Sequence, residues 1–194
     1  MRRFDDIHQN GSKRFMRAVI AISAALVAFA IPPTVDAHGR KEVPSDPALL
    51  EQYQAGLGAF YSSEYAAALK TWLPLAERET ESSAAQIFLG FIYATGLGVA
   101  KDPTTAAEWY GRAAEQDNVL AQIRLAFMYR RGEGAAQDHV QAYLWATLAA
   151  RREGHLQGVA EALQEALAED MTPARIAEAR RLADAWVETH RRAE

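Results

Sequence analysis

The 194-residue chain contains no cysteine. Disulfide bridges, thiolate zinc sites and cysteine nucleophiles are therefore excluded, and packing has to stabilise the fold without covalent cross-links. An excess of basic residues is also missing, since 25 Asp and Glu outnumber 21 Lys and Arg and give a formal net charge of −4. Nucleic-acid binding needs a basic face that neutralises phosphates, so this balance argues against a nucleic-acid partner.

The apolar stretch near the N-terminus, residues 18–31, has 14 residues. It is shorter than the roughly 20 residues that a membrane-spanning helix needs. Basic residues precede it, and two prolines and a small-residue site follow it. This layout predicts a secretory signal peptide over residues 1–37, cleaved after Ala37, with an uncleaved anchor as the alternative. We therefore expect a periplasmic or secreted protein without stable membrane insertion, translated from Met1 or Met16.

The remaining residues, 38–194, carry 16 Lys and Arg against 22 Asp and Glu, a net charge of −6. Such a surface is typical of a soluble protein, and we expect a monomer. Alanine, leucine and glutamate are abundant, which favours an all-α fold. Residues 38–45 are polar and are predicted to form a flexible N-terminus, followed by one repeat domain over residues 46–190.

Residues 85–114 and 121–150 are two copies of one unit, 36 residues apart and aligned without a gap. A period between 20 and 50 residues is typical of arrays of helical units. Identical residues recur in the same order in both copies: Ala85, Gln86, Ile87, Leu89, Phe91, Tyr93, Gly96, Gly98, Asp102, Ala106, Trp109, Ala113 and Ala114 match Ala121, Gln122, Ile123, Leu125, Phe127, Tyr129, Gly132, Gly134, Asp138, Ala142, Trp145, Ala149 and Ala150.

Apolar spacing and capping residues predict the helices of these units. The predicted ranges are 48–61, 64–78, 84–95, 103–116, 120–131 and 139–152, followed by a helix that carries Leu156, Val159, Leu163 and Leu167 and a last helix after Thr172-Pro173. Asp46, Asp102 and Asp138 are predicted N-caps. Gly96 and Gly132 fall where a helix end needs a left-handed residue.

Residues 48–80 are interpreted as a degenerate first unit with a shortened loop. Its second helix is aligned by matching Leu69, Trp72, Leu73 and Ala76 with Ala106, Trp109, Tyr110 and Ala113. Gly58 is predicted to allow a close helix approach, and Pro74 to kink or loosen its helix. The degenerate unit 48–80 is then followed by the repeats 84–118 and 120–152, and residues 155–190 are predicted to form capping helices that cover the last apolar face.

The repeated unit resembles the Sel1-like repeat, a relative of the tetratricopeptide repeat. The resemblance rests on Ala85, Leu89, Gly90, Tyr93, Gly96, Gly98, Val99, Asp102, Ala106, Trp109, Tyr110, Ala113 and Ala114. The second copy departs from the pattern at Ala126, Ala135 and Ala146. The resemblance implies a short α-solenoid of antiparallel helix pairs, wound into a right-handed superhelix with a concave groove.

The resemblance also implies a function: an interaction adaptor of the bacterial cell envelope, not an enzyme, that needs no cofactor and binds a protein or peptide. In this family the first helix of each pair lines the groove. The corresponding inward positions are Ile87, Phe91, Thr95, Ile123, Phe127, Arg130 and Arg131. They suit an extended peptide with an apolar anchor and a carboxylate.

Three alternatives stay open. Both phenylalanines can be core residues, with the two arginines interacting with a helix C-terminus; exposure of Phe91 and Phe127 distinguishes this reading, because full burial removes them from a binding groove. The protein can have a structural, assembly or regulatory role through its outer faces, for example on a sensor kinase. It can also be a peptidoglycan-related enzyme or a glycan binder.

The sequence offers no catalytic or metal site. Asp138-His139 has the composition of a catalytic pair, but Asp102-Pro103 occupies the aligned position, so the aspartate is interpreted as a cap. The Gly-x-Gly pairs lack the preceding strand that a nucleotide-binding loop requires. No histidine has a carboxylate at metal-ligand spacing.

Overall fold

The computed structural model describes residues 43–78 and 83–192. These residues form eight α-helices and no strand, which confirms the predicted all-α fold. The helices are α2 (Pro47–Tyr61), α3 (Tyr65–Ala76), α4 (Ser83–Thr95), α5 (Pro103–Glu115), α6 (Val119–Arg131), α7 (His139–Ala150), α8 (Gln157–Ala168) and α9 (Pro173–Arg192). The predicted signal peptide lies outside the described residues.

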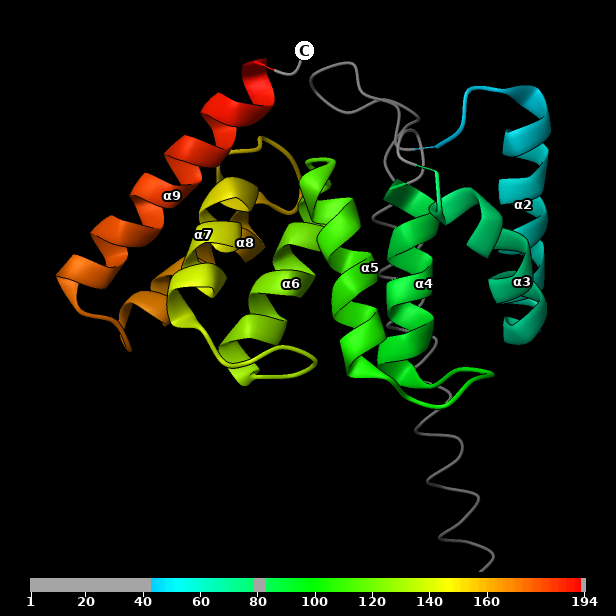
Figure 1. Cartoon of the computed structure of the whole chain (residues 1–194), viewed down its shortest axis with the longest axis horizontal. Helices are drawn as coiled ribbons and strands as arrows, with labels where there is room; N and C mark the ends of the chain where they lie inside the picture. Colours follow the sequence, from blue (N-terminus) through cyan, green and yellow to red (C-terminus); the bar gives the residue numbers. More distant parts are fainter. Residues whose placement is uncertain (1–42, 79–82, 193–194) are drawn as a thin grey trace, which may run out of the picture. The chain divides into compact units, whose positions relative to one another are not determined.

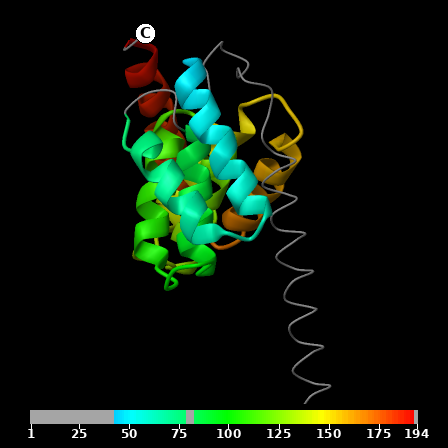
Figure 2. The ribbon, with the colours of Figure 1, turned by 90° about the vertical axis from the view of Figure 1, so that its right-hand side faces the viewer.

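Consecutive helices pair, and each pair packs on the next (Figure 1). The pairs are α2 with α3, α4 with α5, and α6 with α7, while α3 packs on α4 and α5 packs on α6. Figure 2 shows α2 and α3 side by side at the near end of this stack. Both α8 and α9 pack on α7. The described residues therefore form a short α-solenoid closed by two helices.

Aspartate side chains start three of the helices, as predicted. The Oδ1 atom of Asp102 accepts from the backbone N–H groups of Thr104 and Thr105, each at 3.1 Å. Asp46 and Asp138 make the same pair of hydrogen bonds at α2 and α7. Gly96 and Gly132 have φ of 76° and 67°, so both are left-handed as expected. Backbone donors that would otherwise lack partners are thus satisfied at each start.

A glycine on the first helix of a pair receives an aromatic ring from the second. A Cβ at Gly56 would lie 2.3 Å from Nε1 of Trp72, and one at Gly90 would lie 2.7 Å from Cε1 of Tyr110. Gly58 has open space instead, so the prediction of a close approach at Gly58 is wrong. The close contact is at Gly56, two residues earlier, where α2 faces α3.

The same contacts correct the alignment of the first unit by one residue. Trp72 occupies the place of Tyr110, whereas the sequence alignment had matched it with Trp109. Ala68 and Ala106 are both fully buried under this register, while Leu69 and Leu73 are only partly buried. The helix starts agree, because Tyr65 and Pro103 begin α3 and α5. Trp72 follows Gly56 by 16 positions and Tyr110 follows Gly90 by 20, so the loop of the first unit is four residues shorter, one more than a match with Trp109 implies.

One further prediction, about the apolar face of α8, needs correction. Val159 was placed on the apolar face of its helix, but it is 47% exposed. Ala160, Leu163 and Leu167 form the buried face of α8 instead. The helix begins at Gln157, so Leu156 precedes it and does not belong to its apolar face. Pro74 lies inside α3, which continues to Ala76.

Burial of Tyr110 predicts a dependence of stability on alkaline pH. Burial raises the pKa of its phenol to about 12, with a smaller opposing effect from Arg124. Unfolded tyrosine has a pKa of about 10, so the unfolded state loses the proton first. This contribution to the free energy of unfolding is complete below pH 10. It falls by at most about 3 kcal/mol between pH 10 and 12.

Urea denaturation at pH 9 to 12 measures this effect in the wild type and in Tyr110→Phe. The wild type should lose stability more steeply than the variant, which cannot ionise at this position. Parallel pH curves for the two proteins would contradict the prediction.

Candidate functional site

The interfaces between units repeat the same buried hydrogen bond. Nε2 of Gln86 donates to the backbone oxygen of Ala76 at 2.9 Å. Nε2 of Gln122, 36 residues further along, donates to the backbone oxygen of Ala114 at 3.4 Å. Both glutamines are buried. Each glutamine therefore joins the first helix of one unit to the end of the preceding helix. Successive units are thus held together by the same type of contact.

Three of the predicted groove residues are buried. Ile87, Phe91 and Ile123 are 7%, 4% and 4% exposed. Phe60 of α2 explains the burial of Phe91, because the two ring centroids are 6.0 Å apart in an edge-to-face arrangement. These three side chains belong to the core and offer no accessible groove surface, which corrects their placement in the predicted groove.

The other four predicted residues remain at the surface. Phe127 is partly exposed and Thr95 is exposed, with its hydroxyl donating to the backbone oxygen of Phe91 at 2.6 Å. The guanidinium of Arg131 lies 5.7 Å from the centre of the Phe127 ring, a cation–π distance. Arg130 follows in the same last turn of α6. The structure thus brings Phe127, Arg130 and Arg131 together on one helix end.

The acidic partners of these arginines are loosely engaged. Arg130 lies 3.9 Å from Asp170, whose side chain is 57% exposed, and Arg131 lies 3.9 Å from Glu133, whose side chain is 54% exposed. Exposed ion pairs at this distance contribute little to stability. α6 itself contains three arginines and no acidic residue. Its C-terminal end is therefore a cationic surface on an acidic protein that can accept carboxylates.

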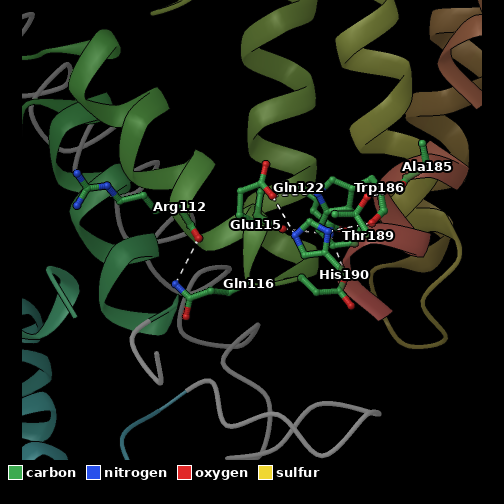
Figure 3. Close-up of polar contacts among 10 residues, drawn as sticks. Arg112, Glu115, Gln116, Gln122, Ala185, Trp186, Thr189 and His190 are labelled. Atoms are coloured by element: carbon green, nitrogen blue, oxygen red, sulfur yellow. Dashed lines mark hydrogen bonds and ion pairs between the residues drawn. The ribbon is translucent and has the colours of Figure 1, made fainter. Parts of the chain in front are cut away.

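A second polar cluster joins the last helix to the middle of the chain (Figure 3). The Oε2 atom of Glu115 accepts from Nε1 of Trp186 at 3.0 Å and lies 3.2 Å from Nε2 of His190. The imidazole stacks on the indole, with ring centroids 3.7 Å apart. Nδ1 of His190 is 2.9 Å from the backbone oxygen of Trp186. The carboxylate of Glu115 thus contacts two side chains of α9, and this cluster fastens α9 to the end of α5.

A buried ion pair joins two adjacent units. Nη1 of Arg152 lies 2.6 Å from Oδ2 of Asp117, and both side chains are about nine-tenths buried, at 11% and 10% exposed. Oδ1 of Asp117 also accepts from Nε2 of Gln122 at 2.9 Å. Neither this pair nor the Glu115 cluster could be predicted from the sequence, because their members lie 35 and 71 or more residues apart. Local sequence patterns do not reveal contacts between residues so far apart in the chain.

The candidate chemical motifs have structural roles. Asp138 accepts from the backbone N–H groups of Val140 and Gln141 at 2.8 and 3.1 Å, which confirms it as a cap. The Nε2 atom of His139 lies 3.4 Å from Nε2 of Gln137, so its neighbour is an amide and not the carboxylate of a catalytic pair. Among residues 43–78 and 83–192, no three His, Asp or Glu side chains gather in a way that could hold a metal ion. Within the same ranges, no helix is both long and apolar enough to cross a membrane.

The fold and the repeated contacts define the class: an α-helical repeat protein built from antiparallel helix pairs. A comparison with protein families identifies the repeat. The Sel1 repeat model matches residues 83–118 and 119–153, so this part of the chain is two Sel1 repeats. Sel1 repeats typically serve as scaffolds for protein–protein interaction and are generally not enzymes.

Several solved structures are similar to this chain, and two of them are described here. One is a protective antigen present in uropathogenic Escherichia coli strains with an SLR fold: 28% identity, a TM-score of 0.64, and coverage of 71% of this chain and 29% of that one. The other is a Sel1 repeat protein from Oxalobacter formigenes: 30% identity, a TM-score of 0.53, and coverage of 59% of this chain and 45% of that one. The present chain spans less than half the length of each. A comparison with curated proteins found no match.

Proposed function

We propose that this protein is a non-enzymatic interaction module of the bacterial cell envelope that binds a protein or peptide partner at the C-terminal end of α6. The observation that carries the proposal is the grouping of partly exposed Phe127 with Arg130 and Arg131 on an acidic protein. The Sel1 repeat supports it, since this fold typically presents a surface to another protein. An apolar ring beside two cations suits a partner segment that carries an apolar side chain and a carboxylate.

The envelope location is part of the proposal and rests on the sequence of residues 1–37. A basic segment, a short apolar stretch and a small-residue site follow one another there, as in a secretory signal peptide. Fractionation of the source cells tests the location. Mass spectrometry of the exported protein should place the new N-terminus at His38, and recovery from the cytoplasm with an intact N-terminus would refute export.

Affinity capture from an envelope extract tests the binding surface. The wild type should retain a partner that the double variant Arg130→Glu/Arg131→Glu loses by roughly tenfold or more, because reversal of two charges repels a carboxylate. The matched control, Arg175→Glu/Arg181→Glu, reverses two exposed charges on α9. Equal capture by both variants and the wild type would overturn the assignment to α6.

A contact through the outer face is the second candidate, and Val159, an exposed apolar side chain on α8, offers a position at which to test it. Val159→Glu belongs in the same capture experiment, because a charge there should disrupt an apolar contact on that face. Loss of the partner in Val159→Glu alone would transfer the binding site from α6 to α8. Circular dichroism of every variant establishes that each one is folded.

A further inference from the structure

The middle of α6 carries a cation without a counter-ion. Arg124 is partly buried, and among residues 43–78 and 83–192 it makes no hydrogen bond or ion pair. The same position of the preceding repeat is Phe88, which is fully buried, so packing does not require a charge there. A guanidinium that loses part of its hydration and gains no acidic neighbour costs free energy. A carboxylate supplied by a partner would recover this cost.

Phe127 and Arg131 lie on the same side of α6 as Arg124. Residues three and seven positions further along an α-helix return to within about 60° of the starting direction. Phe127 is partly exposed, and the guanidinium of Arg131 lies 5.7 Å from the centre of its ring. These three residues, called here the Arg124 face, therefore place two cations about 10 Å apart along the helix axis, with an apolar ring between them.

Arg130 does not share this face. It precedes Arg131 by one residue and so points about 100° away around the helix. Its guanidinium lies 3.9 Å from Asp170, in the turn between α8 and α9. Arg131 lies 3.9 Å from Glu133, and both of these side chains are more than half exposed, at 62% and 54%. A partner's carboxylate can therefore replace Glu133 at Arg131, while Arg130 provides an internal comparison.

We infer that the Arg124 face binds an acidic helix of a partner, with one carboxylate on Arg124, another on Arg131 and an apolar side chain on Phe127. A helix that lies along α6 presents the same side every two turns, about 10 Å, which matches the separation of the two arginines. Side chains on one side of an extended segment recur about every 7 Å, which does not match. The inference rests on the proposed function and adds the conformation and the charge spacing of the partner.

A fluorescein-labelled helical peptide is the probe, and fluorescence anisotropy measures its binding to the protein. It carries two glutamates two helical turns apart, with leucines between them, in a background of alanine and glutamine. One companion peptide has glutamine in place of both glutamates, and another has a central proline that breaks the helix. The wild type should bind the first peptide roughly tenfold or more tightly than either companion. Equal binding of the glutamine peptide would overturn the acidic partner, and equal binding of the proline peptide would overturn the helical one.

Arg124→Gln removes the charge from the middle of the face and should weaken peptide binding roughly tenfold or more. Arg131→Gln should have a similar effect. The matched control is Arg130→Gln, the same substitution on another side of α6, which should change binding by less than about threefold. Undiminished binding by Arg124→Gln would overturn the inference.

Thermal denaturation of Arg124→Gln tests whether the arginine has a structural role instead. Because Arg124 has no hydrogen-bond or ion-pair partner in the described part of the chain, its replacement should leave the thermal midpoint unchanged or higher. A lower midpoint, or a variant that does not fold, would show that the fold needs this cation and would overturn the inference.

Capture from an envelope extract separates the inference from the proposed function. A partner that is lost by Arg130→Glu/Arg131→Glu and by Arg124→Gln supports both. A partner that is lost by the double variant but retained by Arg124→Gln overturns the inference and supports the proposed function. Equal capture by the wild type and all variants overturns both. A wild type that is dimeric by light scattering, with a monomeric Arg124→Gln, assigns the Arg124 face to a second copy of this chain and overturns the separate partner.

Discussion

Replacement of Gly90 by alanine should lower the free energy of unfolding by about 1–3 kcal/mol, the usual cost of overpacking a core. The new methyl group would lie 2.7 Å from Cε1 of Tyr110, closer than carbon atoms can approach. Tyr110 is only 3% exposed, so its ring has little room to move. The gain in helix propensity from glycine to alanine, about 1 kcal/mol, works in the opposite direction. The expected loss of stability is the net result of the two effects.

Tyr110→Ala alone should cost more, about 3–5 kcal/mol, because it leaves a cavity in the core. In that background the effect of Gly90→Ala should change sign, since the methyl group then enters vacant space and the helix propensity gain remains. The second repeat already has this combination: Ala126 and Ala146 stand at the positions of Gly90 and Tyr110, and both are fully buried. The second repeat thus has alanine in place of both the glycine and the aromatic residue.

Chemical denaturation of the wild type, both single variants and the double variant completes this mutant cycle. Gly111→Ala is the control, because Gly111 is also in a helix but a Cβ there meets nothing within 4 Å. It should raise stability slightly. Additive effects, with Gly90→Ala equally destabilising in both backgrounds, would show that the ring does not rest on the glycine.

Local signals were sufficient to predict the helices. The capping aspartates act within three residues of their own position, and the left-handed glycines depend on one backbone angle. The repeat offset then carried the interpretation from one clean unit to the other. Helix boundaries therefore agree with the structure to within a residue or two at most ends.

The contacts between units could not be predicted in the same way. An aromatic residue in the first unit matches either of the adjacent aromatic residues Trp109 and Tyr110, and only the glycine beneath Trp72 decides between them. Likewise, Phe91 and Phe127 have the same place in the sequence pattern. Their different exposure depends on Phe60, which belongs to a different unit. The predicted groove therefore included three core residues, and the binding role of the other four stays a prediction.

Arg152→Met should lower the free energy of unfolding by about 3 kcal/mol. The substitution keeps the apolar stem of the side chain and removes the cation, whose Nη1 atom lies 2.6 Å from Oδ2 of Asp117. Both side chains are largely buried, and loss of one member of a buried pair removes an attraction and a hydrogen bond that offset the desolvation of the other. Asp117 also has a left-handed φ of 62°, so its backbone is already held in a strained conformation by the surrounding contacts.

The neighbouring residue offers a matched comparison. Arg151 makes an ion pair of 2.5 Å with Asp184, but the two side chains are 40% and 68% exposed. Arg151→Met should therefore cost no more than about 1 kcal/mol, because solvent screens this pair. Thermal or urea denaturation of the two variants measures the difference. If both cost the same, burial of the Asp117–Arg152 pair adds nothing to its strength, and other contacts, among them the hydrogen bond from Gln122 to Ala114, hold the second repeat to the preceding one.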